Sequence, residues 1–127
     1  MLLGLVLGAG TAGFAFAADL AGSDWRPNFL AETDLPAGIH MTVHFGPDGK
    51  ITGSGGCNQF FGAYTISGNT IKIGPIASTR KGCPGIIGVE AAFFATLEIA
   101  KSYTQEGKTL VLFDVTGAKI AQFDRAG

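Results

Sequence analysis

Apolar and polar residues alternate from position 39 to position 45, which is the period of a β-strand with one buried and one solvated face. A Gly-Pro-Asp-Gly sequence follows at 46–49 and is typical of a turn, because proline fixes φ and glycine accepts a positive φ. Residues 50–54 continue directly after it, so the two segments are predicted to form a hairpin. Residues 60–66 and 70–73, separated by Ser-Gly-Asn, predict a second hairpin.

The spacing changes between positions 86 and 101, where apolar residues recur every three or four positions, as on one face of an α-helix. The residues with this spacing are Ile86, Val89, Phe93, Leu97 and Ala100. Glu90 and Lys101 fall together on the opposite side, so this helix is predicted to be amphipathic.

Further strands are predicted after the helix, at 102–105, 108–115 and 118–123. Residues 25–30 predict another strand near the start, which Pro27 restricts to a sheet edge or a bulge. Short strands joined by tight turns, with one helix among them, predict an α+β fold that is mostly β. We expect an antiparallel sheet or half-barrel packed on the one amphipathic α-helix.

Residues 1–17 form an apolar, uncharged stretch that ends in Ala15-Phe16-Ala17, the pattern of a secretory signal peptide with a small-x-small cleavage site. A membrane anchor is the alternative, but the stretch is at the short limit for a span and contains several glycines. Cleavage would leave residues 18–127 as one domain with no remaining membrane span. We therefore expect a periplasmic or secreted protein.

The charged residues of the chain are interspersed and give a net charge of −1, so no lasting field attracts polyanions. Nucleic acid is excluded as a partner on this ground. His40 and His44 lie about 13 Å apart on one strand face, too far for one metal ion between them. No metal and no cofactor are assigned.

Three segments carry an ordered motif: Gly-Cys-Asn at 56–58, Thr-Arg-x-x-Cys-Pro at 79–84, and a helix that opens near Glu90. The residues of the motif are Gly56, Cys57, Asn58, Gly62, Tyr64, Thr79, Arg80, Cys83, Pro84 and Glu90. In order and spacing the chain resembles the META domain of the HslJ family of heat-shock proteins. The resemblance implies an envelope or secreted protein, associated with heat-shock or antibiotic stress, often lipid-anchored, and with no settled enzymatic activity. Because this chain lacks a cysteine at the predicted new N-terminus, we expect a soluble form.

Cys57 and Cys83 are the strongest chemical feature. An even cysteine count in an exported chain favours a disulfide, which would close a loop of about 27 residues. Free structural thiols and a reactive thiol are the alternatives, although no C-x-x-C motif or protease signature surrounds either cysteine.

The glycines at 53, 55 and 56 resemble a phosphate-binding loop only superficially, because no Gly-Lys-Ser/Thr ending and no helix follow them. A bulge or a close backbone approach explains them better. Asn58 is interpreted in the same local way, as a residue that tolerates a left-handed conformation or bonds nearby backbone.

Thr79, Arg80 and Glu90 are the best polar candidates for a role beyond folding. In the structural interpretation, which we favour, Arg80 pairs with a carboxylate, with Glu90 as the candidate, and holds the Cys83 loop against the helix. In the functional interpretation these residues border a groove for a partner.

The aromatic residues Trp25, Phe29, Phe93, Phe94 and Tyr103 could line a ligand cavity, but their spacing favours a core. No Ser-His-Asp order or paired-carboxylate motif is present, so the chain is not expected to be an enzyme. The leading hypothesis is a noncatalytic envelope module that binds a protein or another envelope component. The alternative is a secreted inhibitor whose loop between Ile73 and Pro84 blocks a hydrolase.

Overall fold

The computed structural model describes residues 20–127. The predicted signal peptide, residues 1–17, lies outside the described residues. Within residues 20–127, no helix is long and apolar enough to cross a bilayer.

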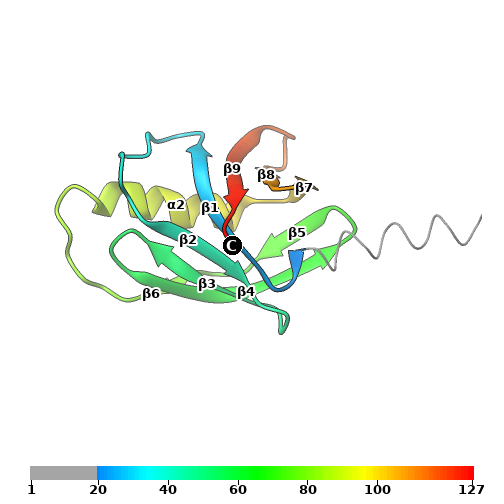
Figure 1. Cartoon of the computed structure of the whole chain (residues 1–127), viewed down its shortest axis with the longest axis horizontal. Coiled ribbons are helices and arrows are strands. Elements are labelled where there is room, and N and C mark those ends of the chain that lie inside the picture. The colour runs from blue at the N-terminus through cyan, green and yellow to red at the C-terminus, as the bar shows by residue number, and fades with distance from the viewer. Residues whose placement is uncertain (1–19) are drawn as a thin grey trace, which may run out of the picture.

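A chain of short strands surrounds one core, and one long helix lies beside them (Figure 1). Both predicted hairpins are confirmed, while the two-residue strand β6 was not predicted. The elements in chain order are β1 (Ser23–Leu30), β2 (Met41–Phe45), β3 (Lys50–Gly55), β4 (Gln59–Ser67), β5 (Thr70–Ile73), β6 (Ala77–Ser78), α2 (Ile87–Ile99), β7 (Ser102–Glu106), β8 (Thr109–Phe113) and β9 (Lys119–Arg125).

The strands pair antiparallel in the order β3-β2-β1-β9-β8-β7-β5-β4, and β4 pairs again with β3, so the sheet closes into a barrel. The predicted mostly-β, antiparallel fold with one helix is confirmed, and the predicted antiparallel sheet or half-barrel is a closed barrel. Closure depends on the length of β4: its first half pairs with β3, as in Gly53 opposite Phe60, and its second half pairs with β5, as in Tyr64 opposite Ile73. Strand β6 pairs antiparallel with the first half of β4, at Phe60 and Phe61.

Strand β1 lies between β2 and β9 and is not an edge strand. Its register with β9 shifts between Pro27 and Phe29. Proline lacks the N–H that a ladder needs, and Pro27 lies where β1 pairs with β9 alone, because its pairing with β2 ends at Trp25. The β1–β9 ladder accommodates it at an irregularity. The bulge predicted as one of two alternatives is confirmed.

The core fills the barrel, and its largest fully buried side chains include Trp25, Phe45, Phe60, Phe93 and Phe123. Alternation in β2 is confirmed, because Met41, Val43 and Phe45 are buried while the residues between them are partly exposed.

Helix α2 brings Phe93 and Leu97 into this core. The helix is confirmed, but Glu90 lies on its buried face and Lys101 lies beyond its end, so their predicted position on a shared polar side is wrong. Glu90 is three residues before Phe93 and seven before Leu97, and these spacings share one helical face.

Candidate functional site

Cys57 and Cys83 form a disulfide with a Cα–Cα distance of 6.1 Å, as the leading interpretation of the cysteines predicted. The bridge ties the loop between β3 and β4 to the segment between β6 and α2. In the chain-entropy model a closed loop of this length stabilises the folded state by about 3.5 kcal/mol.

A buried carboxylate lies next to this bridge. Glu90 is 5% exposed, and its Oε2 accepts hydrogen bonds from the backbone N–H groups of Cys57, at 3.1 Å, and of Asn58, at 2.6 Å. Its Oε1 accepts a third bond from Nδ2 of Asn58, at 2.7 Å. A buried charge is tolerated when hydrogen bonds replace its water, and these three donors do so. The helix is thereby fixed to the β3–β4 loop.

Asn58 extends the network from Glu90 to the segment after β6. Its Oδ1 accepts bonds from Oγ1 of Thr79, at 2.8 Å, and from the backbone N–H of Lys81, at 2.7 Å. Its Nδ2 also donates to the carbonyl of Lys81, at 3.2 Å. Asn58 was expected to bond backbone close to it in the sequence, but the partners of its side chain lie more than twenty residues away. One amide side chain therefore anchors residues 79–81 from the inside.

Arg80 does not take the place predicted for it. Its side chain is exposed, and among residues 20–127 it forms no ion pair. Three N–H groups of Cys57 and Asn58 already donate hydrogen bonds to the Glu90 carboxylate, so no cation has to be buried beside it. The predicted Arg80–Glu90 pair is wrong, while the predicted contact between this loop and the helix is made by Asn58 instead.

The glycines before Cys57 allow a close backbone approach, as predicted. A Cβ at Gly55 would lie 2.6 Å from Cγ of Glu90 and 2.8 Å from Cζ of Phe94. At Gly53 a Cβ would lie 2.0 Å from the carbonyl oxygen of Thr42. Side chains at these positions would displace the strand from the helix and from β2.

An open groove of about 550 Å³ lies between the segment after β5 and helix α2. Asn58 and Glu90 contribute to its lining, but their polar atoms are occupied by the network above. One wall runs from Ile76 to Gly82, and the other is apolar. The helix residues of that apolar wall are Ile87, Ala91 and Phe94.

The remaining signature residues lie apart from this groove. Gly62 is in β4, where a Cβ would lie 3.0 Å from the carbonyl oxygen of Pro75. Tyr64 is buried, and its hydroxyl donates to the carbonyl of Gly46 at 2.5 Å. Burial raises the pKa of this phenol, and the charge of Asp48 raises it further. Pro84 is exposed just before α2. Gly62 and Tyr64 therefore support the fold locally.

The histidines are also placed by the structure. Nδ1 of His44 lies 2.8 Å from Oδ1 of Asp24 on a neighbouring strand, and His40 is exposed. Within the described part of the chain, no three His, Cys, Asp or Glu side chains gather as a metal site would require.

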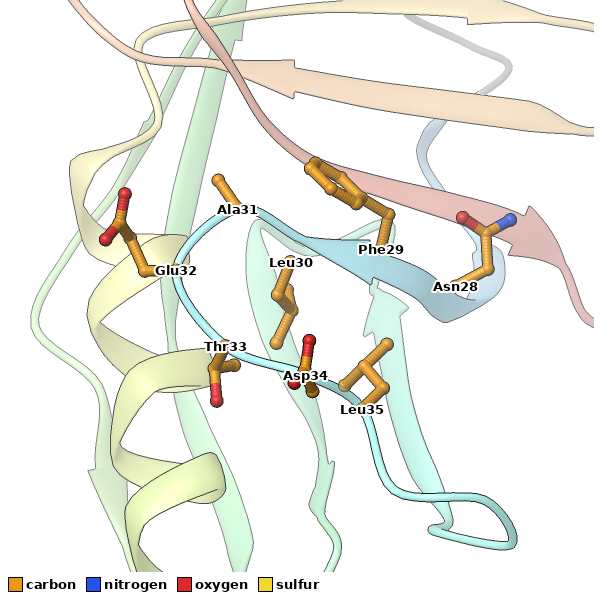
Figure 2. A pocket seen from close by; sticks show the side chains of 8 residues that line it. All are labelled: Asn28, Phe29, Leu30, Ala31, Glu32, Thr33, Asp34 and Leu35. Carbon is orange, nitrogen blue, oxygen red and sulfur yellow. The ribbon is translucent and has the colours of Figure 1, made fainter.

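A second open groove, of about 570 Å³, follows β1 at Asn28–Leu35. Figure 2 shows the chain folding back after Leu30, with Phe29 against the neighbouring strand. No residue of the signature lines this groove. Of the five aromatic residues considered for a cavity, Trp25, Phe93 and Tyr103 are buried in the core, and Phe29 is 38% exposed here.

The family model of the META domain matches residues 18–127. The chain belongs to the META domain family. The structure of this META domain is similar to the NMR structure of a protein from Burkholderia xenovorans, with a TM-score of 0.71 and 21% identity over 88% of this chain and 87% of that one. It is also similar to the crystal structure of a DUF4847 family protein from Bacteroides vulgatus, with a TM-score of 0.65 and 17% identity over 83% and 93% of the two chains. At these identities the likeness concerns the fold alone. The comparison with curated proteins finds no match.

Three polar residues of the META signature, Asn58, Thr79 and Glu90, thus hold segments of the fold together. Lys81 was not predicted to belong to this network, because its contribution is a backbone N–H and carbonyl that no side-chain motif reveals. Arg80 and Lys81 carry exposed positive charges on the segment that Asn58 anchors.

Proposed function

We propose that this META domain is an exported, noncatalytic binding module of the cell envelope, periplasmic or secreted, that supports resistance to heat or antibiotic stress. The observation that carries the proposal is the direction of the signature side chains. Asn58, Thr79 and Glu90 bond one another or nearby backbone, and so they immobilise a loop whose exposed residues include Arg80 and Lys81. A rigid exposed loop loses little conformational entropy when a partner binds.

The noncatalytic part of the proposal has a chemical basis. A general base must reach a substrate proton, and a nucleophile must be free to attack. Both carboxylate oxygens of Glu90 accept hydrogen bonds from the chain itself, and both thiols are in the bridge. The candidate groove is therefore suited to binding and not to proton transfer.

Substitution of Arg80 by alanine separates binding from folding. The side chain is exposed and forms no ion pair within residues 20–127, so the melting temperature should change by no more than about 2 °C. Protection of a strain that lacks the native gene, measured as survival under heat or antibiotic stress, should fall. Lys108→Ala, which removes an exposed cation outside the groove, is the matched control and should retain protection. Full protection by Arg80→Ala would contradict the proposed role of the loop.

Export is tested independently by N-terminal sequencing of the protein recovered from cell fractions. We expect the mature chain to begin after Ala17 and to be found outside the cytoplasm. Recovery from the cytoplasm with residues 1–17 retained would contradict export, whatever the loop binds.

The second candidate function is inhibition of a hydrolase by the loop between Ile73 and Pro84. It is favoured by one observation: the loop is anchored by Asn58 and by the Cys57–Cys83 bridge, yet its residues 79–82 stay exposed. Assays of purified oxidised protein against peptidases and muramidases test this candidate directly. Loss of inhibition is expected when residues 79–82 are replaced together, and equal inhibition by that variant would exclude the loop.

A further inference from the structure

Two neighbouring cations, Arg80 and Lys81, lie exposed in the segment that connects β6 to α2. Figure 1 shows this segment extending well away from the barrel before the helix begins. Within residues 20–127 neither side chain forms an ion pair. A partner could therefore take up either charge without first breaking an internal contact.

The backbone of residues 78–81 is extended, and its N–H and C=O groups point alternately toward β4 and away from it. The N–H of Thr79 donates inward to the carbonyl of Gln59, and the N–H of Lys81 donates inward to Asn58. In an antiparallel ladder the residues between such inward pairs direct their N–H and C=O outward. By this alternation Ser78, in β6, and Arg80, two residues beyond its end, direct their N–H and C=O groups away from β4, at the edge of the sheet.

Asn58 fixes the residues on both sides of Arg80 but leaves Arg80 itself free. The Asn58 side chain accepts a hydrogen bond from the Thr79 hydroxyl at 2.8 Å, and it bonds both the N–H and the carbonyl of Lys81. Two residues beyond Lys81, Cys83 is held by the disulfide. The result is an extended, exposed segment that is fixed at both ends, with a guanidinium at its middle.

We propose that this segment inhibits serine endopeptidases that cleave after arginine or lysine, and that Arg80 enters the anionic specificity pocket of the enzyme. The proposal rests on the second candidate function above and names its target. Such enzymes select a basic side chain through a carboxylate at the base of that pocket. A strand edge with outward backbone groups at Ser78 and Arg80 can pair with the enzyme's own chain, as extended peptides do in strand addition.

Arg80 rather than Lys81 is assigned to the pocket because of the backbone. The N–H and carbonyl of Lys81 are both held by Asn58, so an enzyme could not pair with them without breaking the network. The N–H and the carbonyl of Arg80, in contrast, face outward.

The same anchor explains why such a loop would inhibit and not simply be digested. Attack by the enzyme's serine on the Arg80 carbonyl carbon breaks the bond to the Lys81 nitrogen, and the serine's proton passes to that nitrogen. The products are an ester on the enzyme and a free amine on Lys81. Asn58 and the bridge at Cys83 keep the amine beside the ester, so it attacks in reverse, restores the peptide bond and releases the serine. An amine held beside the ester in this way reacts much faster than water, which would otherwise hydrolyse the ester.

Inhibition assays with oxidised, full-length protein test the proposal, with trypsin as the basic-specific enzyme and chymotrypsin and a muramidase in parallel. We expect inhibition of trypsin with the chain recovered intact by mass spectrometry. Arg80→Ala should weaken inhibition by at least about 30-fold, as loss of a central anchor does. Lys81→Ala, the matched control, should stay within about 5-fold. Arg80→Leu should transfer inhibition to chymotrypsin, a result that a merely structural role would not produce.

Three outcomes would overturn the proposal: no inhibition of trypsin, rapid cleavage between Arg80 and Lys81, or equal inhibition by Arg80→Ala. Inhibition of the muramidase or of chymotrypsin by the unaltered protein, without inhibition of trypsin, would refute the target and leave the inhibitor function standing. If no hydrolase is inhibited, the inhibitor function falls as well. The stress-survival assay of Arg80→Ala then decides the binding module separately.

Discussion

Replacement of Glu90 by alanine should be among the most damaging single substitutions in this META domain. The substitution removes three hydrogen bonds, from the N–H groups of Cys57 and Asn58 and from the Asn58 amide. Each bond to a charged group contributes about 1.5–3 kcal/mol, and a buried donor left without a partner costs about 1–3 kcal/mol. Because such terms are not additive, we expect a loss of about 4 kcal/mol, against a usual total of 5–15 kcal/mol.

The assay is unfolding by heat and by urea, followed by circular dichroism. A loss of about 4 kcal/mol corresponds to a fall of about 15 °C or more in a domain of this size. Glu98→Ala is the matched control on the same helix: this exposed carboxylate accepts one bond, from the N–H of Ile76 at 2.7 Å, which water can replace. Its removal should cost no more than about 1 kcal/mol.

Glu90→Gln sharpens the test because it keeps the shape of the side chain. One oxygen can still accept two of the three bonds, but the new NH₂ group meets another donor, so we expect about half of the alanine effect, roughly 2 kcal/mol. Equal stability of Glu90→Ala and Glu98→Ala would refute the reasoning. A loss of stability in Arg80→Ala equal to that in Glu90→Ala would also refute it, because it would indicate an Arg80–Glu90 ion pair that the structure does not contain.

Three further predictions concern the disulfide, two glycines and Tyr64. Reduction of the Cys57–Cys83 bridge, or its double replacement by serine, should cost about 3 kcal/mol in urea unfolding, and an unchanged midpoint would show that the bridge does not stabilise the fold. Gly55→Ala should destabilise by about 1–3 kcal/mol because its Cβ would overlap the helix, whereas Gly88→Ala, with open space around it, should be neutral or stabilising by up to about 1 kcal/mol. Burial raises the pKa of Tyr64, so the stability that its neutral phenol contributes is complete below the ordinary tyrosine pKa and is lost as pH rises through the folded-state pKa. Phenolate absorbance should show a titration at higher pH than that of ordinary tyrosine, and Tyr64→Phe should abolish it. A single ordinary titration would contradict this.

The local elements could be predicted from the sequence because their signals are local. The alternation from Met41 to Phe45 and the recurrence of Phe93 and Leu97 report which face of a strand or helix is buried. Closure of the barrel could not be predicted in this way. It depends on the register of β4 with both β3 and β5, and on the seam between Thr70 and Ser102, which are non-local pairings.

The candidate site was predicted in part. The disulfide was predicted from two cysteines in a chain whose sequence predicts export, and the groove residues Asn58, Thr79 and Glu90 belong to the sequence signature. The predicted pairing of Glu90 with Arg80 is wrong because opposite charge alone does not determine the partner of a buried carboxylate. A buried carboxylate close to a loop can instead use backbone N–H groups, which carry no sequence signal. Lys81 was missed for the same reason.

The central claim is that Asn58 holds an exposed loop rigid from the inside, and amide hydrogen exchange at Lys81 tests it most directly. Lys81 has an exposed side chain, but its N–H donates to Asn58 at 2.7 Å. We expect NMR to show slow exchange at Lys81, fast exchange at neighbouring Gly82, and loss of the Lys81 protection in Asn58→Ala while Leu110 in the core remains protected. Exchange at Lys81 as fast as at Gly82 in the unaltered protein would contradict the account.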